Sequence, residues 1–213
     1  MRLAVLLSGR GSNFQAIHDA IEGKRLDAAI VCVISNRPDA RGIEKAREYG
    51  YDAHVIDHKT FGDRAAHEEE VLRVLDAARP DYIALAGYMR LLSAPFIERH
   101  RHRILNIHPS LLPSFPGLDV QKKALDWGVK IAGCTVHFVT EGVDEGPIII
   151  QAAVPVMEGD TAETLSVRIL AQEHRIYPRA IQLYAEGRLK VEGRHVVVAG
   201  TSDKAPNALL NPA

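Results

Sequence analysis

The chain has 213 residues, with 26 Lys and Arg against 27 Asp and Glu, and 46% of its residues are hydrophobic. This length suffices for one large α/β domain or two small ones with a sizeable core. The near-balance of charge argues against nucleic acid or an anionic membrane as the main partner. No apolar stretch approaches the roughly 20 residues that a membrane span needs. The N-terminal apolar run, Leu3–Leu7, is too short for a signal peptide.

Both cysteines, Cys32 and Cys134, lie in apolar runs, which predicts buried free thiols and suits a reducing compartment. We therefore expect a cytoplasmic protein that acts on small molecules, without nucleic acid or membrane partners, and that is a monomer or a homodimer.

Apolar runs rich in Val, Ile and Leu alternate with stretches of helical period in the first half of the chain. The expected strands are Leu3–Leu7, Ala28–Ile34, Asp52–Ile56, Tyr82–Ala86 and Arg103–Ile107. The expected helices are Asn13–Glu22, Ala40–Tyr49, Arg64–Ala78 and Pro95–His100. This alternation predicts an α/β fold of Rossmann-like type, with a mostly parallel sheet and helices on both faces.

The pattern changes after Gly117 and predicts an antiparallel C-terminal extension. A helix over Leu118–Trp127 precedes strands Ile131–Val139 and Pro147–Val156, and a helix over Thr161–Glu186 follows, bent near Pro178 and opened by a capping-box-like Asp160 and Glu163. The strands Leu189–Glu192 and His195–Val198 form a closing pair. We expect a single domain over residues 1–200, with halves of about 1–100 and 101–200, and a disordered tail over 201–213.

The stretch "LLSGRGSNFQAI" carries the first strand through a Gly/Ser loop into a helix. Glycines let a ligand approach the backbone, and the free amides of a helix start attract anions. The stretch is neither a dinucleotide fingerprint nor a Walker loop, so a phosphate monoester is its expected ligand. A tight turn with Ser12 or Asn13 as helix cap is the alternative.

The stretch "NIHPSLLPSFPG" begins at the end of a predicted parallel strand, where ligands gather in open α/β folds. Asn106 and His108 point to the same side of an extended chain, and Pro109 keeps His108 extended. An amide can donate to an oxyanion and an imidazole can move a proton, which suits acyl-type transfer. A structural polar pair at a strand end is the alternative.

Two further stretches place polar side chains at strand ends. In "FVTEGVDEGPIII", Glu141, Asp144 and Glu145 crowd one loop, which is either solvated or brings a carboxylate that raises the pKa of His108. In "LAGYMRLLS", Met89 and Arg90 suit a slot for a flat ring or form a turn at the edge of the core.

The remaining histidines do not indicate a metal. His100 and His102 are expected at the surface and His137 on a strand, and no spacing matches a zinc signature.

Five stretches occur together in one order: "SGRGSN", "LAGYMRLLS", "NIHPSLLPSFPG", "GCTVHFVTEGVDEGPIIIQ" and "QEHRIYP". In this order and spacing the chain resembles the monofunctional, folate-dependent glycinamide ribonucleotide formyltransferases over roughly residues 1–193. The resemblance implies transfer of the formyl group of 10-formyltetrahydrofolate to the glycinamide amine of glycinamide ribonucleotide in purine biosynthesis. It implies no metal and no nicotinamide.

The resemblance also implies residue roles. Asn106, His108 and Asp144 match the catalytic residues: the first two stabilise the oxyanion, His108 moves protons, and Asp144 orients and charges its imidazole. The nucleotide would contact Gly11, Ser12, Asn13 and Glu173. The folate would contact Arg64, Met89, Arg90, Leu91, Leu92, Asn106, Val139, Thr140, Glu141, Gly142, Val143 and Asp144. The N-terminal half would bind phosphate, the C-terminal half would bind folate and carry catalysis, and the Leu112–Pro113 bond would be cis.

Three alternatives stay open. A formyltetrahydrofolate deformylase would pass the formyl group to water and usually carries an N-terminal regulatory domain, which we do not expect here. A methionyl-tRNA formyltransferase usually adds a C-terminal RNA-binding domain and a basic surface. A non-catalytic nucleotide-phosphate binding domain would leave Asn106, His108 and Asp144 without a role.

Overall fold

The computed structural model describes residues 1–200 and 210–211, and the chain divides into two compact units, Met1–Asn106 and Ile107 onward. The division falls inside β5 (Ile104–His108). None of the helices within the described ranges combines the length and apolar character needed to cross a membrane.

The first unit alternates strands and helices. Its strands are β1 (Arg2–Leu7), β2 (Ala29–Ser35), β3 (Ala53–Val55), β4 (Tyr82–Leu85) and the start of β5. Its helices are α1 (Ser12–Glu22), α2 (Arg41–Glu48), the 3₁₀ turn η1 (His58–Thr60), α3 (Arg64–Ala78) and α4 (Ala94–Arg99). The strands pair in the order β5-β4-β1-β2-β3, all parallel, as the alternation predicted.

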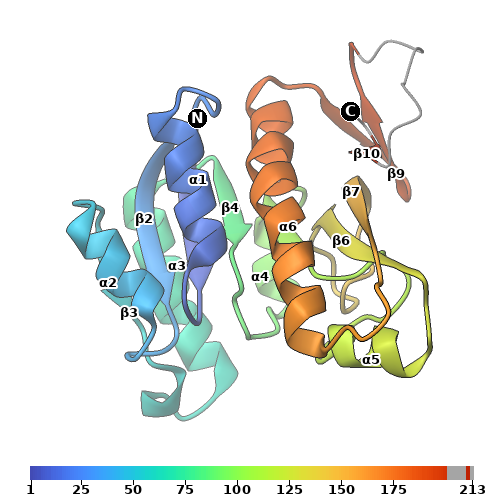
Figure 1. Ribbon diagram of the computed structural model, residues 1–213. Helices are drawn as coiled ribbons and strands as arrows, with labels where there is room; N and C mark the ends of the chain where they lie inside the picture. The colour runs from blue at the N-terminus through green and yellow to red at the C-terminus, as the bar shows by residue number, and fades with distance from the viewer. Residues whose placement is uncertain (201–209, 212–213) are drawn as a thin grey trace. The chain divides into compact units, whose positions relative to one another are not determined.

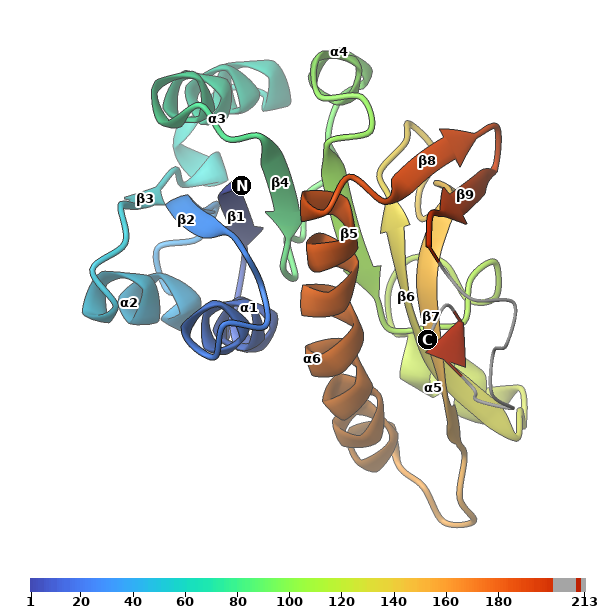
Figure 2. The same cartoon turned by 90° about the horizontal axis from the view of Figure 1, so that it is seen from above.

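Helices cover both faces of this parallel sheet. Figure 2 shows α1 and α2 on one face and α3 and α4 on the other. Residues 3–7 of β1 are completely buried, and so is Tyr82 of β4, because a central parallel strand is shielded from water on both sides.

Helix starts in this unit follow the expected capping chemistry. The side chain of Asp63 accepts the Ala66 N–H at 2.9 Å, and Ser93 caps α4 with a proline in the first turn. The helix α1 begins one residue earlier than predicted, with Gly11 as its cap.

The second unit is built around an antiparallel ladder of β6 (Ile131–Phe138) and β7 (Ile148–Pro155). The helix α6 (Ala162–Ala185) packs along both strands, as Figure 1 shows in orange, and α5 (Val120–Asp126) packs on α6. A hairpin of β8 (Leu189–Glu192) and β9 (His195–Val198) follows.

Three sequence predictions for this unit need correction or completion. The capping box of α6 is formed by Thr161 and Thr164 instead of Asp160 and Glu163, and the helix continues through Pro178. Asp160 forms an ion pair with Arg168 at 2.7 Å, which occupies its carboxylate. Within the predicted tail, β10 (Leu210–Asn211) pairs antiparallel with β7, and residues 201–209 and 212–213 lie outside the described ranges.

Candidate active site

The strand β5 ends in a histidine with little contact to solvent. His108 has 5% of its surface exposed, and its Nε2 atom lies 2.9 Å from the carbonyl oxygen of Phe115. A carbonyl can only accept, so Nε2 carries the proton in this contact. Ser110 Oγ also donates to the Phe115 carbonyl, at 3.2 Å. The loop after β5 therefore holds one edge of the imidazole.

The loop between β6 and β7 brings a carboxylate to the other edge of the same ring. Asp144 Oδ2 lies 3.3 Å from His108 Nδ1 and accepts the backbone N–H of Gly117 at 2.9 Å. Asp144 has φ 55°, in the left-handed region that non-glycine residues seldom adopt. Such strained conformations cluster at functional sites, where surrounding contacts hold them.

Burial and charge act against each other on this pair. Burial lowers the pKa of His108 below its ordinary value, although the Phe115 carbonyl and Asp144 both act to raise it. The carboxylate thus acts on His108 in the expected direction, but the net change is downward because desolvation of the charged ring outweighs its carboxylate partner. Burial acts to raise the pKa of Asp144, but contacts from His137 and Gly117 and the His108 imidazole lower it overall. The carboxylate thus stays charged beside an imidazole that readily releases its proton.

The proline-rich loop after His108 is anchored to the ladder of the second unit. The Leu112–Pro113 peptide bond is cis, as the resemblance implied. The backbone of Leu112 donates to Thr135 Oγ1 at 3.1 Å and accepts from Gln151 Nε2 at 2.9 Å. These bonds give the loop a defined path. Asn106 is half-buried on β5, on the same face of the strand as His108 by the two-residue period.

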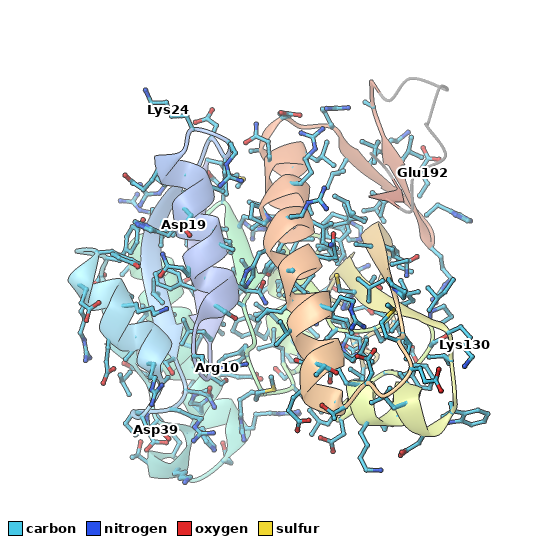
Figure 3. All side chains as sticks on the ribbon, viewed as in Figure 1. Arg10, Asp19, Lys24, Asp39, Lys130 and Glu192 are labelled. Carbon is cyan, nitrogen blue, oxygen red and sulfur yellow. The ribbon has the colours of Figure 1, made fainter. Side chains whose placement is uncertain are left out.

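In the first unit, the Gly/Ser loop opens α1 as the sequence predicted. Gly11 has φ 71° and caps the helix without any side-chain hydrogen bond, and Asn13 is buried. A Cβ at Gly11 would lie 2.6 Å from Gly42 Cα, so close backbone packing demands glycine here. Figure 3 marks Arg10 in the loop that enters this helix. The first-turn amides have the arrangement of an anion site.

The segment Met89–Leu92 follows β4 and is held at both ends within the first unit. The Met89 N–H donates to Ser8 Oγ at 2.7 Å, and the Ser93 N–H donates to the buried Glu68 carboxylate at 2.8 Å. Met89 and Leu91 are 65% and 61% exposed, two large apolar side chains within one short segment. An anchored segment that presents apolar side chains suits a flat, largely apolar ligand.

The other predicted binding residues divide between the units. Arg64 is the first residue of α3 in the first unit. Val139–Val143 lie in the β6–β7 loop of the second unit, with Val143 46% exposed. Glu173 lies on α6 and is buried.

Sequence reasoning overlooked three groups that contact His108 or Asp144. Gly117 supplies an N–H to Asp144, Phe115 supplies a carbonyl to His108, and His137 places its Nε2 atom 3.7 Å from Asp144 Oδ1. The first two are backbone groups in the "NIHPSLLPSFPG" stretch. Because nearly every residue carries such groups, the residue type does not indicate which of them will contact a side chain. His137 was considered only as a metal ligand. Conversely, His100, expected at the surface, is buried in the first unit, whereas His102 is exposed as expected.

The fold is that of an α/β protein with polar side chains at strand ends, and the paired imidazole and carboxylate are groups that move protons. The chain belongs to the formyl transferase family, whose sequence model matches residues 1–181. It is 44% identical over 191 residues to phosphoribosylglycinamide formyltransferase of Escherichia coli, covering 90% of each chain.

Similar solved structures agree with this assignment. The crystal structure of glycinamide ribonucleotide transformylase 1 from Symbiobacterium toebii superposes with a TM-score of 0.91 at 56% identity, covering 93% of both chains. A formyltetrahydrofolate deformylase from Pseudomonas syringae is more distant, with a TM-score of 0.83 at 30% identity over 92% of this chain and 65% of that one.

The chain also resembles part of larger proteins. It is 52% identical over 191 residues to the trifunctional purine biosynthetic protein adenosine-3 of Drosophila pseudoobscura, but it spans only 14% of that protein's length.

Proposed function

We propose that this chain transfers the formyl group of 10-formyltetrahydrofolate to the amine of glycinamide ribonucleotide in purine biosynthesis, giving formylglycinamide ribonucleotide and tetrahydrofolate. The observation that carries the proposal is the 3.3 Å approach of His108 Nδ1 to Asp144 Oδ2, with His108 on the strand that also bears Asn106. The likeness to enzymes named for this reaction supports the choice of substrates.

In this mechanism the substrate amine attacks the formyl carbon and a tetrahedral oxyanion forms. The Asn106 amide donates to that oxyanion, and the Nε2–H of His108 joins it by leaving the Phe115 carbonyl that it contacts in the absence of substrate. A histidine whose pKa is lowered by burial readily gives up a proton that it has accepted, and so returns to its neutral form. Asp144 orients the ring and stabilises the imidazolium whenever it forms, and water relays protons between the amine and the departing folate nitrogen.

We assign the nucleotide phosphate to the loop Gly11–Asn13, where helix-start amides and a left-handed glycine favour an anion. Glu173 would bind the ribose or amine end of the same substrate. The folate would bind Arg64, Met89–Leu92, Asn106 and Val139–Asp144, with the exposed Met89 and Leu91 against its ring.

A cytoplasmic location belongs to the same proposal. Cys32 and Cys134 are both free and buried, and burial raises the pKa of the Cys32 thiol to about 12. Inert thiols of this kind suit a reducing compartment.

The test is a formyl-transfer assay with 10-formyltetrahydrofolate, with and without glycinamide ribonucleotide. Tetrahydrofolate should form only when the nucleotide is present, and formylglycinamide ribonucleotide should form in equal amount. Formate release without the nucleotide would instead indicate a deformylase. No turnover under either condition would indicate a non-catalytic binding domain.

A further inference from the structure

A second buried imidazole lies beside Asp144, on the ladder of the second unit. His137 is 2% exposed near the end of β6. The register of β6 and β7 shifts there, since Val136 faces Ile150 but His137 faces Ile148. Bulges change the direction in which a side chain points and are frequent next to active sites.

One edge of the His137 ring is held by backbone. Its Nδ1 atom lies 2.9 Å from the carbonyl oxygen of Phe138, which can only accept, so Nδ1 donates. Gly146 covers this edge: a Cβ there would overlap the Phe138 carbonyl oxygen and lie 3.4 Å from Nδ1. A side chain at position 146 would therefore displace the carbonyl group that His137 Nδ1 contacts.

The other edge of the ring faces the carboxylate. Nε2 of His137 lies 3.7 Å from Oδ1 of Asp144, while Oδ2 faces His108 Nδ1 at 3.3 Å. The longer distance exceeds hydrogen-bond length, and it is an ion-pair separation whenever the His137 imidazole is protonated at both nitrogens. The two imidazoles thus meet different oxygens of one carboxylate, which is 12% exposed.

We propose that His137 is a positioning residue, which acts through Nε2 on Oδ1 of Asp144 and keeps Oδ2 directed at His108. The inference rests on the proposed function, because it explains how the charged partner of the catalytic imidazole is oriented. Asp144 sits in a left-handed backbone conformation, and its carboxylate is contacted on both oxygens. Gly117 holds Oδ2 from one side, and His137 faces Oδ1 from β6.

Two substitutions separate the two edges of the His137 ring. His137→Gln keeps a donor near the place of Nε2, whereas His137→Asn keeps a donor near the place of Nδ1 only. If Nε2 positions Asp144, His137→Asn should lower kcat on the order of 10²-fold, as expected when a catalytic group is misplaced by about 1 Å. His137→Gln should retain most of the activity, and KM for both substrates should change little.

A measurement without substrates keeps this inference separate from the proposed function. The His108 pKa is read by NMR with and without Asp144→Asn, in the native, His137→Asn and His137→Gln backgrounds. Loss of the Asp144 charge should lower the His108 pKa in the native and His137→Gln backgrounds. The change should shrink in the His137→Asn background, because Oδ2 no longer faces the ring. This result is expected even if the enzyme transfers a group other than formyl or uses an acceptor other than glycinamide ribonucleotide.

The control for loss of a buried imidazole is His100→Asn in the first unit, which should keep native kcat. Native-like kcat in His137→Asn with an unreduced pKa change would overturn the proposal. So would equal losses in folded His137→Asn and His137→Gln, because that result assigns the ring a packing role. If neither variant folds, the nitrogen resonances of His137 are compared between the native protein and Asp144→Asn. An unmoved Nε2 resonance there would likewise refute the contact.

Discussion

His108 Nδ1 lies 3.3 Å from Asp144 Oδ2, although one residue ends β5 and the other belongs to the loop between β6 and β7. Burial lowers the pKa of the His108 ring, and the Asp144 carboxylate opposes that change. Activity should therefore depend on the two residues together.

Asp144→Asn keeps the shape of the side chain and removes its charge. We expect the His108 pKa to fall further and kcat to fall on the order of 10²-fold or more, because the imidazolium formed during proton transfer loses its partner. NMR titration and steady-state kinetics measure the two effects. If the group acts as a unit, adding His108→Ala should do little further harm. Fully multiplicative losses would contradict this coupling.

Asn106→Ala removes the neutral donor proposed for the oxyanion. We expect a loss of about 10²–10³ in kcat, the range found when one oxyanion donor is deleted. The melting temperature should change little, because Asn106 is only half-buried on β5. A variant with near-native kcat would make Asn106 a structural residue.

Ser12→Asp tests the phosphate site without crowding the glycine contact. A carboxylate in the first turn of α1 stabilises the helix but repels a bound phosphate. We expect KM for glycinamide ribonucleotide to rise at least tenfold while KM for the folate stays nearly constant. Ser12→Asn is the neutral control. Equal changes in both KM values would place the phosphate elsewhere.

Met89→Ser tests the exposed apolar segment. Burying a methionine side chain contributes roughly 1.5–3 kcal/mol, so its loss should raise KM for the folate about 10- to 100-fold. The matched control is Trp127→Ser, since Trp127 is 80% exposed and outside the predicted site. Similar KM values in both variants would remove Met89 from the folate site.

His100 should make the fold sensitive to acid. Burial, with Arg103 and Arg99 nearby and Asp76 opposing them, lowers its pKa to about 4. The unfolded chain therefore binds a proton at higher pH than the native chain. His100 therefore leaves the free energy of unfolding unchanged above pH about 6.5 and decreases it as the pH drops toward about 4.

In the variant His100→Asn, the decrease in the free energy of unfolding between pH about 6.5 and about 4 should be smaller by roughly 2–3 kcal/mol, at about 1.4 kcal/mol per pKa unit. Urea unfolding of both proteins at several pH values measures the difference. If the free energies of unfolding of the two proteins change in parallel from pH 7 to pH 4, His100 is protonated equally in the native and unfolded chains.

Much of the fold could be read from short windows of sequence. The apolar runs at β1 and β4 and the periodic stretch of α3 predicted their own conformations, because burial and helical period leave local patterns. The Gly/Ser loop before Ser12 marked a helix start for an equally local reason. The cap of α6 was misjudged because Asp160 is engaged by Arg168.

The sequence by itself determined the strand–helix alternation, the glycine-opened helix, and the placement of Asn106 and His108 on one face of β5, since each depends on neighbours along the chain. Only the tertiary structure decided which groups surround His108. Its carboxylate comes from the β6–β7 loop, its carbonyl from Phe115, and a second imidazole from a register shift in β6. The net direction of its pKa was also decided there, because desolvation depends on everything packed around a ring and leaves no pattern in the chain.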